Sequence, residues 1–206
     1  MKCFAVFYAG TALLAAGCAN PINEATWHRY TAAGNAAKAR GDLGTAEEAH
    51  RRAVINARVG NLGAEHEALA LHNLALVKRD LCKLDEAEES LRRAYELRDK
   101  NPDTPPRNLT GTIVELAQLY YEQRRYADVA PLMERGLPLL VQLDVERVNP
   151  ATFAHVLVEY ADTLRNLNRT TDADNVDARV TTLVSARGID MQQRPNRPPF
   201  DHPPCR

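Results

Sequence analysis

The feature that most restricts how this chain can fold is a set of small residues that recurs about every forty residues. Gly34, Ala75, Ala117 and Ala161 are separated by 41, 42 and 44 residues. Three further columns repeat these gaps, namely Leu43, Leu84, Tyr126 and Thr170; Ala46, Ala87, Val129 and Ala173; and Ala53, Ala94, Gly136 and Val180. Such a fixed period is typical of a solenoid of stacked repeats, so the spacing predicts four copies of one unit.

Each unit has the pattern of a helix pair. Its small residues lie 12 and then 7 positions apart, which puts one on a first helix and two on a second, where the helix axes can approach closely. Larger residues form an apolar stripe ahead of the first column, at Tyr30 and Ala33, Leu71 and Leu74, Ile113 and Leu116, and Leu157 and Tyr160. No long alternating run of β-branched residues is present, so the chain is predicted to be all-α.

The pattern predicts eight helices in four pairs. Their expected ranges are 24–39, 43–59, 64–81, 85–100, 108–123, 127–145, 151–167 and 171–187. Residues 101–107 (NPDTPPR) and the pair Asn149-Pro150 cannot continue a helix and are expected to be loops. Pro138 lies deep in a predicted helix, where the loss of a backbone hydrogen bond favours a bend.

Short motifs inside the units resemble a known repeat. Residues 40–43 (RGDL), 72–75 (HNLA), 84–88 (LDEAE) and 91–95 (LRRAY) are similar to the tetratricopeptide repeat, in the longer form of kinesin light chains and many bacterial proteins. The resemblance implies a right-handed α-solenoid of about four helix pairs over residues 24–188. In the fourth unit Thr170, Asp177 and Val180 replace Leu84, Leu91 and Ala94, which suits a polar cap at the end of a solenoid.

The first residues have the pattern of a targeting signal. Lys2 precedes an uncharged run at 4–16 that is too short to span a bilayer, so residues 1–17 are predicted to be a signal peptide. Residues 14–18 (LAAGC) resemble the lipobox of bacterial lipoproteins. That resemblance implies cleavage before Cys18 and covalent diacylglycerol and N-acyl lipid on Cys18, with residues 18–23 as a short linker and no other cofactor. The alternatives are a conventional cleavage site beside an incidental cysteine, and a buried apolar helix.

The compartment follows from the same motif. Ala19 stands where an Asp would retain a lipoprotein at the inner membrane, so the resemblance implies a lipid anchor on the periplasmic face of the outer membrane. Cleavage leaves Cys82 and Cys205 as the only pair able to form a disulfide. Two free thiols are favoured, because Cys82 falls in a predicted tight turn and Cys205 in a Pro-rich tail, 189–206, that is expected to be disordered.

Several functional classes are disfavoured by composition and motifs. The 26 basic and 27 acidic residues nearly cancel, so no field exists to attract nucleic acid. No phosphate-binding loop, nucleophile elbow or paired-cysteine motif occurs, so we expect neither catalytic residues nor a small-molecule substrate. His66 and His72 are six residues apart and lie on different faces of one helix, and no metal site is expected there.

The remaining candidate is the concave groove, which the first helix of each pair lines in the family that the chain resembles. The resemblance places these residues in it: Thr31, Asn35, Lys38, Leu69, His72, Asn73, Leu76, Arg79, Val114, Glu115, Gln118, Tyr121, His155, Glu159, Asp162 and Arg165. One version of this groove clamps a terminal carboxylate with two asparagines and several cations. Asn35 and Asn73 match the asparagines, but Glu115 stands where a cation is needed and would repel a carboxylate.

These observations predict a non-catalytic adaptor whose partner is an envelope protein or peptide and which contacts the membrane through its lipid. Pilus, secretion or cell-wall machinery would be its setting by analogy with other members of the family. Two alternatives stay open. One is a periplasmic enzyme subunit or metal-binding protein that uses His66, His72 or His155, and the other is a cytoplasmic adaptor whose N-terminal signal has been misinterpreted.

Overall fold

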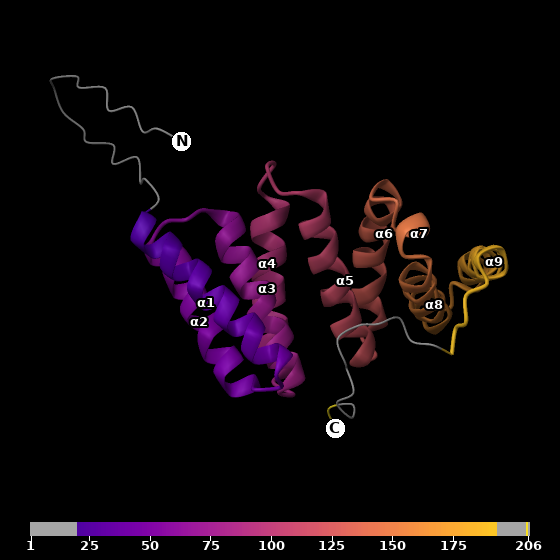
Figure 1. Ribbon diagram of the computed structural model, residues 1–206. Coiled ribbons are helices and arrows are strands. Elements are labelled where there is room, and N and C mark those ends of the chain that lie inside the picture. The colour runs from indigo at the N-terminus through magenta and orange to yellow at the C-terminus, as the bar shows by residue number, and fades with distance from the viewer. Residues whose placement is uncertain (1–19, 193–204, 206) are drawn as a thin grey trace, which may run out of the picture.

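A computed structural model describes residues 20–192 and Cys205. Over these residues the chain forms helices and no strand (Figure 1). The helices are α1 (Pro21–Ala39), α2 (Leu43–Val59), α3 (Ala64–Asp80), α4 (Leu84–Asp99), α5 (Pro106–Glu122), α6 (Tyr126–Gln142), α7 (Val145–Val148), α8 (Pro150–Asn166) and α9 (Thr170–Arg187). The all-α prediction is confirmed, and only the single turn α7 was missed.

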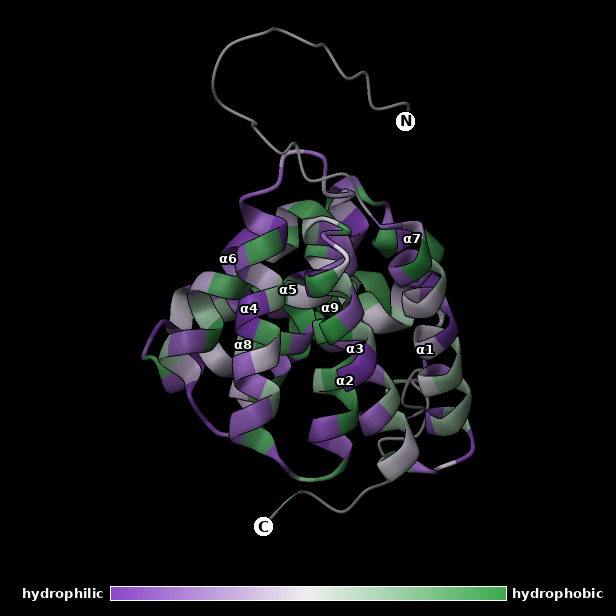
Figure 2. Cartoon of the chain, turned by 90° about the vertical axis from the view of Figure 1, so that its left-hand side faces the viewer, coloured by the Kyte–Doolittle hydropathy of each residue, from purple (hydrophilic) through white to green (hydrophobic). Residues whose placement is uncertain are grey.

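The helices pack as consecutive pairs, α1 with α2, α3 with α4, α5 with α6 and α8 with α9. Neighbouring pairs also contact one another, so the molecule is a solenoid that runs from the indigo to the yellow end of Figure 1. Figure 2, which looks along the stack, shows both hydrophobic and hydrophilic residues along the helices.

Helix starts are set by asparagine and proline. The Asn20 side chain accepts a hydrogen bond of 3.0 Å from the Ile22 amide and caps α1, and Asn149 caps α8 in the same way. Proline follows both caps at the first helical position, where a missing amide hydrogen costs least. Because Asn20 caps it, α1 begins at Pro21, three residues before its predicted start at Glu24.

α6 continues through Pro131 and Pro138 to Gln142, and the bend near Pro138 stays a prediction.

The small columns lie where helices approach one another. The side chains of Ala46, Ala75, Ala87 and Ala161 are fully buried. In unit one the predicted apolar stripe is wrong, because Ala33 is exposed and Tyr30 only half-buried, while Trp27 fills the core with 4% of its surface exposed. The terminal helix α1 has a neighbouring pair on one side only, so fewer of its positions are buried. At the other end α9 buries only Ala173 and Leu183, as a polar cap requires.

The turn within each helix pair contains one residue with a positive φ angle, a recurring position that the sequence did not reveal. These residues have φ angles of 76°, 59°, 58° and 60°, and are Gly41, Cys82, Arg124 and Asn168. In each turn the following amide donates to the carbonyl five residues earlier, as from Lys83 to Lys78 over 2.9 Å. This left-handed conformation closes each turn and reverses the chain between the two helices.

Cys82 and Cys205 form a disulfide with Cα atoms 5.4 Å apart and a sequence separation of 123 residues. The expectation of two free thiols is therefore wrong. It assumed that Cys82 is buried in its turn, but this residue is exposed and its Sγ can reach another segment. The tail is also packed in part, because Ile189 and Met191 contact the core. Residues 193–204 of this tail lie outside the described residues, as does Arg206.

The predicted signal peptide at 1–17 and the lipid-attachment residue Cys18 also lie outside the described residues. Within the part that the structure describes, no helix combines the length and apolar character needed to cross a bilayer.

Candidate partner-binding groove

The predicted groove residues lie on α1, α3, α5 and α8, the first helices of the four pairs. Most are partly accessible: Asn35 and Arg165 are exposed, whereas Lys38, Asn73 and Leu76 are half-buried. His72, Tyr121, Glu159 and Asp162 are likewise half-buried, whereas Arg79 and Gln118 are 5% and 6% exposed. A partner could therefore touch most of this row, but those two side chains support the row from beneath.

Polar contacts join neighbouring repeats along this row. Lys38 of α1 pairs with Asp80 of α3, and Arg79 Nη1 of α3 lies 3.1 Å from Glu115 Oε2 of α5. The Tyr121 hydroxyl of α5 donates to Asp162 of α8 over 2.9 Å. These contacts cross from one unit to the next, so they fix the spacing of the four first helices.

Two predicted residues keep their polar groups available. The side-chain amides of Asn35 and Asn73 form no hydrogen bond to another described residue. An amide can donate and accept at the same time, which matches the alternating amide and carbonyl groups of an extended peptide backbone. The carboxylate of Glu115, by contrast, pairs with Arg79, so this pair offers no free cation to an anionic chain end.

Similar folds among solved structures identify the architecture. BtubC (BKLC) from P. vanneervenii aligns with a TM-score of 0.71 at 18% identity, over 85% of this chain and 69% of that one. A Podosopora anserina protein, described as a kinesin light chain with nearly identical TPR-like repeats, gives 0.59 at 17% identity, over 79% and 76%. The chain has a tetratricopeptide-like fold of stacked helix pairs. This confirms the resemblance seen in the repeat motifs.

A third neighbour with a similar fold is aspartyl phosphate phosphatase F from Bacillus subtilis. It has a TM-score of 0.64 at 12% identity, and the alignment covers 81% of this chain but 42% of that one. No family model matches this sequence, and no curated protein matches it. At these identities the neighbours establish the fold of this tetratricopeptide-like chain, and its partner has to be argued from its own surface.

Units two and three of the repeat protein share a buried polar cluster that the sequence did not predict. Arg98 of α4 is 3% exposed and donates to Glu65 Oε1 over 2.8 Å and to Thr112 Oγ1 over 2.5 Å. Thr112 Oγ1 in turn lies 3.3 Å from Nδ1 of the groove residue His72. Burial lowers the pKa of His72 to about 4, so at neutral pH the imidazole is uncharged.

Four groove residues, Val114, Gln118, Tyr121 and Glu159, meet at a small hollow between α5, α6 and α8. Gln118 donates to Glu159 over 3.4 Å at its edge, and Tyr121 lies beside them. Burial, with the bond to Asp162, raises the pKa of Tyr121, so its hydroxyl stays a donor at every ordinary pH. The remaining lining is apolar apart from Tyr160 and consists of Ala117, Val129, Met133, Val156 and Tyr160.

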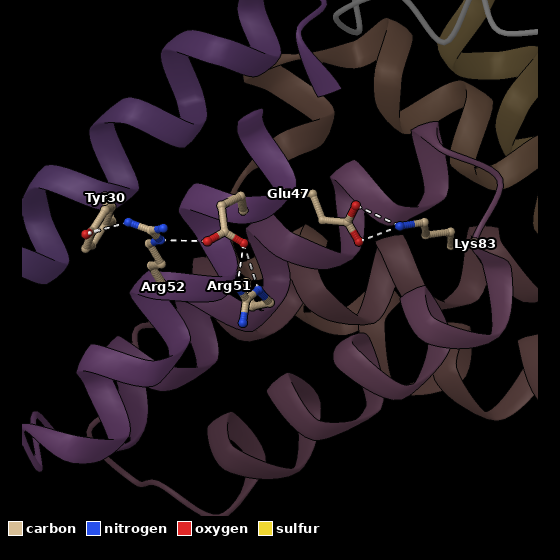
Figure 3. Close-up of polar contacts among 6 residues, drawn as sticks. Tyr30, Glu47, Arg51, Arg52 and Lys83 are labelled. Carbon is tan, nitrogen blue, oxygen red and sulfur yellow. Dashed lines mark hydrogen bonds and ion pairs between the residues drawn. The ribbon is translucent and has the colours of Figure 1, made fainter. Parts of the chain in front are cut away.

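Ion pairs also connect the second helices of neighbouring pairs. Lys83, at the start of α4, bonds both oxygens of Glu47 on α2 at 2.8 and 2.7 Å, as Figure 3 shows. Arg125 at the start of α6 reaches Glu88 over 2.6 Å, and Arg169 at the start of α9 reaches Glu134 over 2.6 Å. The basic residue at the start of each later second helix therefore bonds to the second helix before it.

The same surface holds a chain of contacts in unit one. Arg52 donates to the Tyr30 hydroxyl over 3.2 Å and to Glu48 over 2.7 Å, and Arg51 shares Glu48 (Figure 3). Exposed ion pairs of this kind contribute little free energy, but they leave few polar groups for a partner. The groove on the first helices is therefore the better candidate site.

Proposed function

We propose that this chain is a non-catalytic adaptor that holds an extended segment of another protein along its groove. The observation that carries the proposal is the pair Asn35 and Asn73, whose amides lack partners among the described residues, in a row that is otherwise fixed by contacts between repeats. A rigid row of this kind binds without paying the cost of ordering its own side chains. Backbone hydrogen bonds then supply affinity and neighbouring side chains supply selectivity.

The charges of the groove define the partner's chemistry. Lys38, Arg79 and Arg165 are each paired, with Asp80, Glu115 and Asp177. The charges of these three cations are therefore neutralised, and a neutral, polar segment with occasional apolar side chains fits the row best. An envelope protein or peptide meets this description, and a polyanion such as nucleic acid does not.

We propose further that the adaptor is a lipoprotein anchored through Cys18 at the periplasmic face of the outer membrane. Two features of the described residues support this. The Cys82–Cys205 disulfide is typical of proteins in an oxidising compartment. Ile22 and Val59, each 74% exposed, lie near the start of α1 and the end of α2, beside the point where the described chain begins. Apolar side chains at an anchored end would contact lipid.

The groove is tested by site-specific photo-cross-linking in cells. A photoreactive amino acid at Asn73 is expected to form one discrete adduct, and the same probe at Glu89, exposed on the second helix α4, serves as the matched control. Asn35→Ala should reduce the Asn73 adduct without changing protein level. Equal adducts from both positions, or none from Asn73, would overturn the groove assignment.

The anchor is tested separately by intact mass and membrane fractionation beside a Cys18→Ala variant. A chain that begins at Cys18 with added acyl mass, and a variant that leaves the outer membrane, are the expected results. Persistence of residues 1–17 without lipid would refute the anchor and favour a cytoplasmic adaptor, while leaving the groove proposal standing.

A further inference from the structure

Three metal-ligating side chains from two repeats converge at the first end of the solenoid. Glu24 and His28 lie one turn apart on α1, and His66 comes from the first turn of α3. One ligand atom from each residue lies within 4.8 Å of the others. None of the three belongs to the groove, so the cluster is independent of the proposed function.

A buried tryptophan holds the two imidazoles in place. The Trp27 ring, 4% exposed, makes edge contacts with both histidines, with ring centroids 4.9 Å from His28 and 4.7 Å from His66. The two imidazole centroids are 6.4 Å apart. Ligands that are oriented by packing before the ion arrives lose less freedom on binding, which favours affinity.

We propose that Glu24, His28 and His66 form a binding site for a zinc ion. Two imidazoles and one carboxylate are ligands that zinc prefers, whereas calcium and magnesium take oxygen atoms almost alone. Zinc bonds of about 2.0–2.1 Å in a tetrahedron bring ligand atoms to about 3.4 Å from one another, so the side chains close in by a small rotation. The fourth position is then left to water.

The bound ion would connect two repeats. α1 belongs to the first pair and α3 to the second, and these helices contact each other little directly. Zinc would fasten them at the end where the described chain begins, and would stiffen the junction of units one and two. Because such an ion binds the folded state and not the dispersed ligands of the unfolded chain, it would also raise the melting temperature.

Zinc titration of the purified full-length protein tests the site. We expect one equivalent to bind, and His28→Gln and Glu24→Gln each to weaken binding at least about 10-fold. His155→Gln, at a histidine outside the cluster, should leave the affinity unchanged. His28 is exposed, so its variant should fold, and an unchanged circular dichroism spectrum confirms this. Equal zinc affinity in wild type and His28→Gln would overturn the proposal.

The chain's single tryptophan provides a second, direct measurement. Cu²⁺, which binds imidazole sites and quenches nearby fluorescence, is expected to quench Trp27, and excess Zn²⁺ should restore the emission by competition. His66→Gln should abolish the saturable part of this quenching, and His155→Gln should not. Quenching that persists in both His28→Gln and His66→Gln would show that the ion binds elsewhere and would refute the assignment.

Discussion

The imidazole of His50 lies so close to Gly34 that a Cβ on this glycine would come within 2.6 Å of the ring. His50 is fully buried on α2, and Gly34 faces it from α1. The first member of the small-residue column is therefore a requirement of packing, because only a missing side chain allows these two helices their observed separation.

Replacing Gly34 by alanine should accordingly destabilise the protein, by about 1–3 kcal/mol, because the added methyl group overpacks the α1–α2 contact. Gly44 of α2 is the matched control, since a Cβ there meets nothing within 4 Å. Gly44→Ala should stabilise by about 0.5–1 kcal/mol through helix propensity. Urea unfolding measures both, and equal effects of the two substitutions would contradict this account of the column.

Stability should fall as the pH is lowered from about 6.5 to about 4. Burial, with the charge of Lys38, lowers the pKa of His50 to about 4, and burial does the same for His72. The unfolded chain binds these protons near pH 6.5 and the folded chain does not, so acid favours unfolding. Each histidine accounts for up to about 3 kcal/mol.

Urea midpoints at pH 7, 5.5 and 4.5 measure this loss, and His50→Gln should make the curve shallower over the same window. Gly44→Ala, which removes no titratable group, is the control and should leave the slope unchanged. A stability that is flat from pH 7 to 4.5 would show that these imidazoles are protonated without cost.

Reduction of the Cys82–Cys205 bond should lower the melting temperature. The bond closes a loop with a sequence separation of 123 residues, and removal of a cross-link over so long a loop typically costs about 2–4 kcal/mol. Calorimetry with and without reductant measures it. Cys205→Ser should melt at the lower temperature under both conditions, and any further response to reductant in that variant would point to a different disulfide.

Sequence alone predicted the helices and the order of the pairs because periodic small and apolar residues record the packing of a repeat directly. Ala75 and Ala87 are buried as expected, and the predicted ends of α2 agree with the structure. The left-handed turns were missed because Cys82 and Arg124 are not residue types that signal positive φ, whereas Gly41 and Asn168 are. Cys82, Arg124 and Asn168 adopt the same conformation because the repeat requires it.

The site was only partly predictable for a related reason. The repeat period predicts which residues lie on the first helix of each pair. It does not predict their hydrogen-bond partners, which depend on which side chains meet across repeats, as Tyr121 meets Asp162. Along the sequence, the nearest histidine to His66 on the same helix is His72. The proximity of His66 to His28 depends on how α1 packs beside α3, which the sequence does not show. A charge column at Lys83, Arg125 and Arg169 was visible in the sequence and would have indicated the ion pairs between second helices.

The buried guanidinium of Arg98 provides the last prediction. It is 3% exposed and bonds to Glu65, Thr112 and the carbonyl of Asn108, so it ties α3, α4 and α5 together. Arg98→Met should destabilise by about 3 kcal/mol, because it leaves the Glu65 carboxylate without its cation in a partly buried place. Arg93→Met, at a half-exposed arginine on the same helix, should change stability by less than about 0.5 kcal/mol. Thermal unfolding of the two variants side by side decides the matter: a loss that is equal in both would mean that units two and three are joined by apolar packing alone.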